Sequence, residues 1–332
     1  MFVLKYKSSL MNDMENLSFC IAIASHISNP SRITYLIDCL GSLLQQTIVI
    51  PIYLSISFEN ESTKEIFIGE LEANNFQYSP YINITFQENK TPQMRHFQVL
   101  FQTMKINHNW IMFCDDDDTY DLSRVENLIK SIYTIQDQCN DPMKTLAGLY
   151  ESHCNKDHRE HRHEYWCYCV NRSIMERFYN TLEEYPDIID NKCCDVLFGE
   201  YMRRLGANHF FGRLDMRLYN YRVTENQDSV TGVIQSRQSI YTKMGDHPLI
   251  GDPNLPDYIL DWNDYLYKNL NVYLHDVFLR TIVGCEFDSI LKSEFRGDYD
   301  LLPYIDDCHV DTMRNQHEYW RTVCKKLYDI QL

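Results

Sequence analysis

The stretch Trp110-Ile111-Met112-Phe113-Cys114 runs directly into Asp115-Asp116-Asp117-Asp118. An apolar run of this length predicts a buried strand, and the acids then stand at its carboxyl end. Adjacent carboxylates repel one another and raise one another's pKa, so they are gathered at the mouth of a sheet chiefly where a divalent cation is held. The alternative is a solvated acidic turn that holds no ligand.

Strand and helix patterns alternate on both sides of this stretch. Before it, strands are expected at 19–24, 50–58 and 82–86, and helices at 32–46, at 62–74 and from 91 onward. After it, residues 122–135 carry apolar side chains at helical spacing. This alternation predicts an α/β fold with a mostly parallel sheet flanked by helices, which binds ligands at the carboxyl ends of its strands.

Beyond residue 140 the pattern is less regular. Strands are expected at 145–150, 165–170, 209–212 and 216–223, and helices at 173–179 and 194–205. Glycines and prolines gather between 245 and 256, ahead of a helical tail rich in aromatic residues. We therefore expect one domain over 1–245 and a mostly helical C-terminal appendage over 246–332.

Composition excludes several classes of partner. The formal charge of −16 over 332 residues argues against a nucleic-acid-binding surface and against attraction to an anionic membrane. No window approaches ~20 uninterrupted apolar residues, so no membrane span is expected. Residues 1–17 lack the apolar core of a signal peptide. The 12 cysteines lack the spacing of a disulfide framework, which predicts reduced thiols and a cytoplasmic location.

From about residue 19 to about residue 231, the order of motifs resembles the nucleotide-sugar-dependent glycosyltransferases of the GT-A fold, most closely family 2. The helix end Ser42-Leu43-Leu44-Gln45-Gln46-Thr47 is similar to the family's SLL-QT signature. The run Asp115 to Asp118 resembles its DxD motif in the form D-x-D-D. The resemblance implies a GT-A fold with a nucleotide-sugar half at about 18–120 and an acceptor half at about 121–245.

The resemblance also implies ligands. Asp115 and Asp117 would hold Mn²⁺ or Mg²⁺, whose charge can neutralise a departing nucleoside diphosphate. Asp115 and Asp116 would lie near the nucleotide. The family also uses the end of the first strand and the start of the third helix around the nucleotide, and the matching positions here are Ala24, Ser25, His26, Arg32, Gln93, Arg95 and His96. Arg95 is favoured over Arg32 as a phosphate partner.

The segment Cys193-Cys194-Asp195, followed by a helix that ends Arg203-Arg204-Leu205-Gly206, resembles the family's "ED" and R-x-x-G motifs. The match implies that Asp195 removes the proton of an acceptor hydroxyl during an inverting transfer, with Glu200 as the fallback. The expected acceptor is a glycan or another hydroxyl compound. An alternative is that Asp195 caps its helix.

Two segments depart from the family pattern. Residues 55–59 (Ser-Ile-Ser-Phe-Glu) stand where many members have a base-reading aspartate, and residues 219–226 hold no histidine where many members supply one to the metal. A UDP-sugar is the expected donor, while GDP- and dTDP-sugars stay open. A third protein ligand for the metal stays unassigned. The same departures favour another alternative, a nucleotide-binding module without turnover.

Two further alternatives concern the acidic run. An EF-hand calcium loop would begin at Asp115, but its sixth position is Tyr120 where a sharp turn requires glycine. A haloacid-dehalogenase-type phosphatase would use Asp115 as nucleophile and Asp117 as acid/base. That family normally opens with this strand, whereas here three strand-helix units precede it.

A segment rich in histidine and cysteine spans residues 153–169. Such side chains can bind zinc, but the segment lacks paired ligand spacing and charged residues interrupt it. We expect a loop that faces the substrate, with zinc as the alternative. Trp166 could stack on a sugar or belong to the core.

Overall fold

The structure is a computed structural model that describes residues 18–138, 144–151, 164–205, 208–222, 274–275, 277–294 and 306–328. The chain divides into two compact units, of which the first comprises Met1–Arg222 with Lys326–Leu332 and the second Val223–Lys325. The predicted boundary near residue 246 and the segment 153–163 lie outside the described residues. Both therefore stay predictions.

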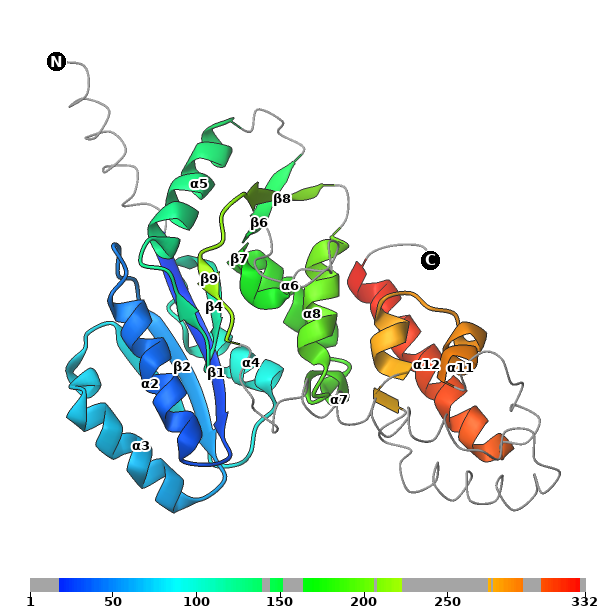
Figure 1. Cartoon of the computed structure of the whole chain (residues 1–332). Coiled ribbons are helices and arrows are strands. Elements are labelled where there is room, and N and C mark those ends of the chain that lie inside the picture. Colours follow the sequence, from blue (N-terminus) through cyan, green and yellow to red (C-terminus); the bar gives the residue numbers. More distant parts are fainter. Residues whose placement is uncertain are drawn as a thin grey trace, which may run out of the picture. The chain divides into compact units, whose positions relative to one another are not determined.

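Strands and helices alternate in the first unit (Figure 1). Up to the acidic run they are β1 (Ser18–Ile27), α2 (Ser31–Leu44), β2 (Ile52–Phe58), α3 (Glu61–Ala73), η1 (Phe76–Tyr78), β3 (Ile82–Phe86), α4 (Gln93–Thr103) and β4 (His108–Asp115). Then follow β5 (Thr119–Tyr120), α5 (Arg124–Gln138), β6 (Thr145–Glu151), η2 (Tyr165–Cys167), β7 (Tyr168–Asn171), α6 (Arg172–Leu182), α7 (Pro186–Ile189), α8 (Cys194–Arg203), β8 (His209–Leu214) and β9 (Tyr219–Asn220). Nearer the C-terminus lie α11 (Phe287–Glu294) and α12 (Asp307–Tyr328).

The main sheet has seven strands in the order β3-β2-β1-β4-β7-β6-β8. Neighbours pair in parallel except at β7, which is antiparallel to both β4 and β6. A second sheet joins β5 and β9 in antiparallel register. The predicted fold class, an α/β domain with a mostly parallel sheet flanked by helices and a helical C-terminal part, is confirmed.

The core follows from the apolar runs of the sequence. The side chains of β4 from Ile111 to Cys114 are fully buried, as expected for a central strand covered on both faces. On α2 the buried residues recur at spacings of three and four, so one face of the helix packs inward.

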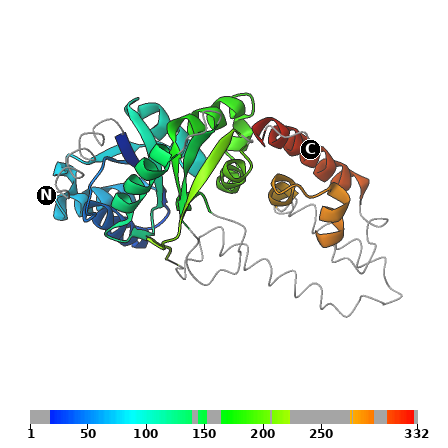
Figure 2. The same cartoon turned by 90° about the horizontal axis from the view of Figure 1, so that it is seen from above.

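The helices lie on both faces of the sheet. Connections between parallel strands are right-handed, so α4, which connects β3 to β4 in the opposite direction across the sheet, lies on the face opposite α2 and α3. Figure 2 shows these layers from above.

The chain reverses direction across the sheet at β1. It leads from β1 to β2 and β3 on one side, and then returns to β4 on the other. Such a switch point leaves a crevice at the carboxyl ends of the two strands, where α/β proteins bind ligands. In the paired register Ala24 of β1 stands beside Asp115 of β4. The acidic run therefore lies at the switch point.

Three differences from the expected elements concern the later half. A strand was expected over 216–223, but β9 has only two residues because its partner β5 is equally short. The strand expected from residue 165 begins with the turn η2, and α7 was not expected. In the part of the chain that the structure describes, no helix is long and apolar enough to cross a membrane, and all ten cysteines are free thiols.

Candidate metal and nucleotide site

The four aspartates form a closed turn, here called the acidic turn (Asp115–Asp118). The backbone N–H of Asp118 donates to the carbonyl of Asp115 at 3.2 Å, which closes the turn at the end of β4. Asp116 and Asp118 are buried, whereas Asp115 and Asp117 are half-buried. Burial thus alternates along the turn, so the first and third acids are the more accessible pair.

Asp116 is bonded within the protein through both oxygens. The hydroxyl of Ser25 donates to Oδ2 at 2.5 Å, and Nη2 of Arg32 donates to Oδ1 at 2.9 Å in a largely buried ion pair. Ser25 lies near the end of β1 and Arg32 in the first turn of α2. The structure therefore brings together three of the residues that the sequence assigns to the nucleotide.

Asp118 anchors the acidic turn to the segment that contains β9. Its Oδ1 accepts from the backbone N–H of Arg222 at 2.6 Å, and its Oδ2 accepts from the hydroxyl of Tyr219 at 2.8 Å. The same hydroxyl accepts from the backbone N–H of Asp115 at 2.9 Å. Tyr219 thus bridges the two ends of the turn, a role that the sequence does not reveal.

Asp115 has two partners from distant elements. Nε2 of Gln93, the first residue of α4, donates to its Oδ1 at 3.1 Å, and the hydroxyl of Tyr165 donates to the same oxygen. Gln93 also donates to that hydroxyl at 2.7 Å. Gln93, which the resemblance assigns to the nucleotide, therefore lies beside the acidic turn. Tyr165, which packs edge-on against Phe97 and Phe113, was not anticipated.

The site carries more negative charge than its arginines compensate. Burial raises the pKa of Asp115 well above its ordinary value, and the charges of Asp118 and Asp117 raise it further. The pKa of Asp117 is raised to about 6, first by burial and then by the charge of Asp116. Burial raises the pKa of Asp118 to about 7. A bound divalent cation would relieve this repulsion, so the donor chemistry of the turn fits Mn²⁺ or Mg²⁺.

Asp195 lies in the first turn of α8, and the helix cap position is Cys193. Burial raises the pKa of Tyr165 well above its ordinary value, and the charges of Asp115 and Asp195 add to that rise. Asp195 is therefore within electrostatic range of the hydroxyl that bonds the acidic turn. The fallback residue Glu200 is buried and accepts from Arg204 Nε at 3.1 Å.

Two other residues assigned to the nucleotide, His26 and His96, bond side chains in or just after β2. His26 Nδ1 bonds the hydroxyl of Ser57 at 2.9 Å, and its Nε2 bonds Glu59 at 3.2 Å. Burial lowers the pKa of His26, although Glu59 opposes the shift. His96 is buried, lies within hydrogen-bond distance of Ser55 and Ser57, and has its pKa lowered to about 4 by burial.

Arg95 does not contact the acidic turn in this structure. Its Nε and Nη2 both donate to Asp190 at 2.8 Å, and Nη2 also donates to the carbonyl of Pro186 at 3.0 Å. Successive helical residues are rotated by about 100°, so Arg95 points roughly 200° away from Gln93. The guanidinium that the sequence favours for a phosphate is therefore engaged by α7 and the residue that follows it.

Trp166 is 4% exposed and belongs to the core. Its ring stacks on Tyr219 at 4.2 Å between centroids and on Tyr221 at 5.3 Å. Tyr221 is 38% exposed, and its pKa is raised to about 12 by burial and then by the charge of Asp118. Of these three rings, the one that reaches solvent beside the acidic turn is thus Tyr221.

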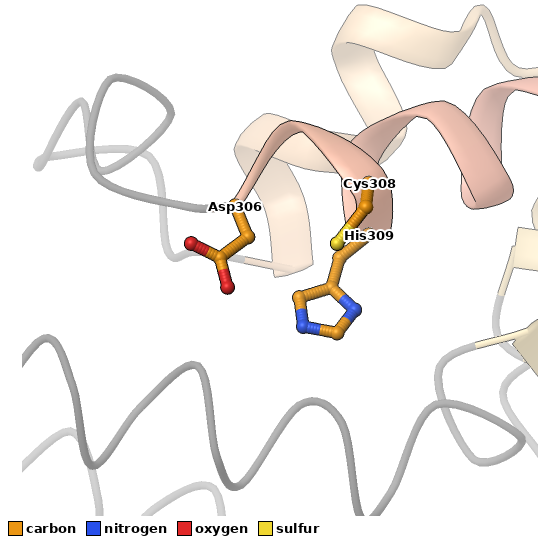
Figure 3. A group of neighbouring side chains, drawn as sticks. All are labelled: Asp306, Cys308 and His309. Atoms are coloured by element: carbon orange, nitrogen blue, oxygen red, sulfur yellow. The ribbon is translucent and has the colours of Figure 1, made fainter.

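A second group of metal-ligating side chains lies at the start of α12. The donor atoms of Asp306, Cys308 and His309 lie within 4.8 Å of one another (Figure 3). Asp306 directly precedes the helix, where aspartate commonly serves as a cap, and both Asp306 and Cys308 are exposed. Among the described residues, no other three such donor atoms come this close, those of the acidic turn included.

No protein-family model and no curated protein matches the chain. Solved structures do show a distant likeness. S. aureus TarS is 11% identical with a TM-score of 0.42, over 93% of this chain and 55% of TarS, so the match spans about half of its length. The mannosyltransferase PcManGT from Pyrobaculum calidifontis, in complex with GDP-Man and Mn²⁺, is 11% identical with a TM-score of 0.47, over 93% of this chain and 84% of that one.

A third similar structure is 4-diphosphocytidyl-2C-methyl-D-erythritol synthase from Anaerococcus prevotii. It is 10% identical with a TM-score of 0.41, over 66% of this chain and 99% of that one. These similar structures thus include a mannosyltransferase and a synthase. The likeness is distant, and the chemistry of this chain therefore rests on its own side chains.

Proposed function

We propose that this chain is a metal-dependent glycosyltransferase that moves a sugar from a nucleoside-diphosphate sugar to an acceptor hydroxyl. The observation that carries the proposal is the alternation within the acidic turn. Asp116 and Asp118 are buried and bonded, while Asp115 and Asp117 are half-buried at the switch point between β1 and β4. This alternation supports Asp115 and Asp117 as the pair that the DxD resemblance implies.

Asp115 and Asp117 would hold Mn²⁺ or Mg²⁺, which suit hard carboxylate oxygens. The bound ion supplies the positive charge that stabilises a departing diphosphate. Mg²⁺ commonly binds one or two carboxylates together with substrate phosphates, so a two-carboxylate site is sufficient when the nucleotide is present. Gln93 and Tyr165 orient Asp115, and Arg32 keeps Asp116 turned away from the crevice.

Asp195 is the proposed base of an inverting transfer. Its position in the first turn of α8 puts it within electrostatic range of Tyr165, which bonds Asp115. A carboxylate there can accept the proton of an acceptor hydroxyl while that oxygen attacks the anomeric carbon. Glu200 is a weaker candidate because its carboxylate already accepts from Arg203 and Arg204.

A UDP-sugar is the donor that we propose, with a glycan or another hydroxyl compound as the acceptor and the cytoplasm as the location. At the end of β2 the nearest carboxylate is Glu59, which pairs with His26 at 3.2 Å.

The test is hydrolysis of UDP- and GDP-sugars by the purified chain, with Mn²⁺ and with chelator. Asp117→Asn should abolish metal-dependent hydrolysis, whereas Glu70→Gln on the exposed side of α3 should leave it unchanged. Hydrolysis that persists in chelator, or in the Asp117 variant, contradicts the metal role. Release of phosphate from an aryl phosphate that is lost in Asp115→Asn would instead support the phosphatase alternative.

A further inference from the structure

A buried ion pair joins α5 to β6 and takes no part in the chemistry proposed above. Arg124, the first residue of α5, is fully buried and donates from Nε to Glu151 Oε1. Its Nη2 donates to the carbonyl of Trp166 at 3.0 Å. Removing an arginine and a glutamate from water is costly unless their remaining polar atoms are bonded. The second carboxylate oxygen of Glu151 is bonded in this way.

The second oxygen of Glu151 holds the backbone of β9. Its Oε2 accepts from the N–H groups of Leu218 and Tyr219, each at 3.0 Å. β5 pairs with β9, and the backbone N–H of Asp121, the residue after β5, donates to the carbonyl of Leu218 at 2.8 Å. The guanidinium of Arg124 lies 5.0 Å from the centroid of the Tyr219 ring. The main chain and the ring of Tyr219 are thus both fixed.

Tyr219 transmits this rigidity to the acidic turn. Its hydroxyl accepts from the backbone N–H of Asp115 and donates to the carboxylate of Asp118. The two residues at the ends of the turn are thereby held by one oxygen atom. Asp117, between them, can present its carboxylate to the crevice only while the turn keeps this shape. Groups that orient metal ligands in this way typically change metal affinity by roughly 10- to 100-fold when they are removed.

We propose that Tyr219, held by the Arg124–Glu151 pair, is the positioning residue of the metal-binding turn. The proposal rests on the function proposed above, because it assumes that Asp115 and Asp117 bind the metal. The hydroxyl of Tyr219, and not merely the packing of its ring, sets the affinity of the chain for the metal–nucleotide complex.

Tyr120 offers a matched control. It stands opposite Tyr219 in the β5–β9 pair, is similarly buried, and lies 4.0 Å beneath the same guanidinium. Its hydroxyl, however, donates to the carbonyl of Phe113 in β4 at 2.5 Å and not to an acid of the turn. Replacing either tyrosine with phenylalanine removes one buried hydroxyl and keeps the ring. Tyr219→Phe removes this partner from the backbone N–H of Asp115 and from the carboxylate of Asp118, whereas Tyr120→Phe removes it from the carbonyl of Phe113.

The experiment measures the Mn²⁺ concentration that gives half-maximal UDP binding, by calorimetry on the full chain, for wild type, Tyr219→Phe and Tyr120→Phe. GDP is substituted if UDP does not bind. We expect this concentration to rise roughly 10-fold or more in Tyr219→Phe and less than about 2-fold in Tyr120→Phe. The temperature of thermal unfolding without metal should fall more in Tyr219→Phe than in Tyr120→Phe, because the hydroxyl of Tyr219 makes two hydrogen bonds and that of Tyr120 makes one.

The outcomes separate the two proposals. If wild type binds neither nucleotide with Mn²⁺, the proposed function is contradicted and the role of Tyr219 falls with it. If wild type binds and the two phenylalanine variants have equal Mn²⁺ requirements, the proposed function stands and the positioning role is wrong. If Tyr219→Phe weakens Mn²⁺-dependent nucleotide binding and Tyr120→Phe does not, the positioning role is supported.

Discussion

The hydroxyl of Tyr165 donates a hydrogen bond to the carboxylate of Asp115, although the residues are 50 positions apart in the chain. Asp115 ends β4, and Tyr165 begins the short turn η2 that precedes β7. The contact joins the part of the chain assigned to the donor with the part assigned to the acceptor. The orientation of the first acid of the turn thus depends on a residue from the later half.

Tyr165→Phe should weaken metal-dependent nucleotide binding by roughly 10-fold, since it removes a hydrogen bond that orients a proposed metal ligand. Tyr179→Phe is the control, because Tyr179 is also buried but donates to the backbone carbonyl of Met94 at 2.8 Å. Calorimetry with UDP and Mn²⁺ gives the comparison. Equal affinities for the two variants would show that Gln93 alone suffices to orient Asp115.

Asp195→Asn should lower sugar transfer or donor hydrolysis at least about 100-fold, because a general base typically contributes that much. Binding of UDP with Mn²⁺ should stay within about 2-fold of wild type, since the proposed base touches the acceptor and not the donor. Asp187→Asn, an exposed acid in the first turn of α7, serves as the control. A loss of nucleotide binding equal to the loss of rate would contradict the role of base.

Arg32→Met should lower the free energy of unfolding by roughly 2 kcal/mol in the absence of metal. The change leaves Asp116 without its charged partner and removes positive charge that lowers the pKa of Asp117. Lys64→Met breaks an exposed ion pair with Glu61 and should cost less than about 0.5 kcal/mol. Urea unfolding curves of both variants give the two costs, and similar values would show that the Asp116 pair contributes no more than a surface pair.

His96 should make stability depend on pH between about 6.5 and about 4. Its pKa is about 4 in the folded protein, so the unfolded chain takes up the proton first. The free energy of unfolding therefore falls as pH is lowered through this window, by at most roughly 3 kcal/mol from this residue. His96→Gln keeps groups that can bond Ser55 and Ser57 but does not titrate.

The raised pKa values of Asp117 and Asp118 act in the opposite direction. The folded protein holds those protons at pH values where the unfolded chain has lost them, so the two residues favour the folded state as pH falls.

The measurement is therefore the difference between wild type and His96→Gln in the free energy of unfolding, obtained from urea unfolding at several pH values. The stability advantage of wild type over the variant should shrink from pH 7 to pH 4. A constant difference would show that His96 is protonated equally in both states.

The sequence predicted the parts of the site that follow from periodicity and order. An apolar run identified β4, and the family resemblance implied Ser25, Arg32 and Gln93, whose side chains bond the acids at the same edge of the sheet. These residues lie there because the ends of parallel strands and the starts of the helices that follow them share one edge of the sheet.

The remaining contacts depend on direction and distance that no local pattern encodes. Arg95 was favoured for the phosphate, yet two residues along a helix face nearly opposite ways, and it pairs with Asp190. Tyr165 and Tyr219 reach the acidic turn from 50 and 104 positions away. Neither shows any local sign of that contact. Their roles follow from the packing of the sheet around β4.

The single reversed strand β7 has a consequence for how the crevice is assembled. Because β7 runs against its neighbours, the chain enters it at the edge where the parallel strands finish. The residues just before it, Tyr165–Cys167, therefore arrive beside the acidic turn. In a wholly parallel sheet they would stand at the far edge, a full strand length away. Because β7 runs antiparallel to its neighbours, a late segment of the chain thus contributes side chains to the crevice at the end of β1.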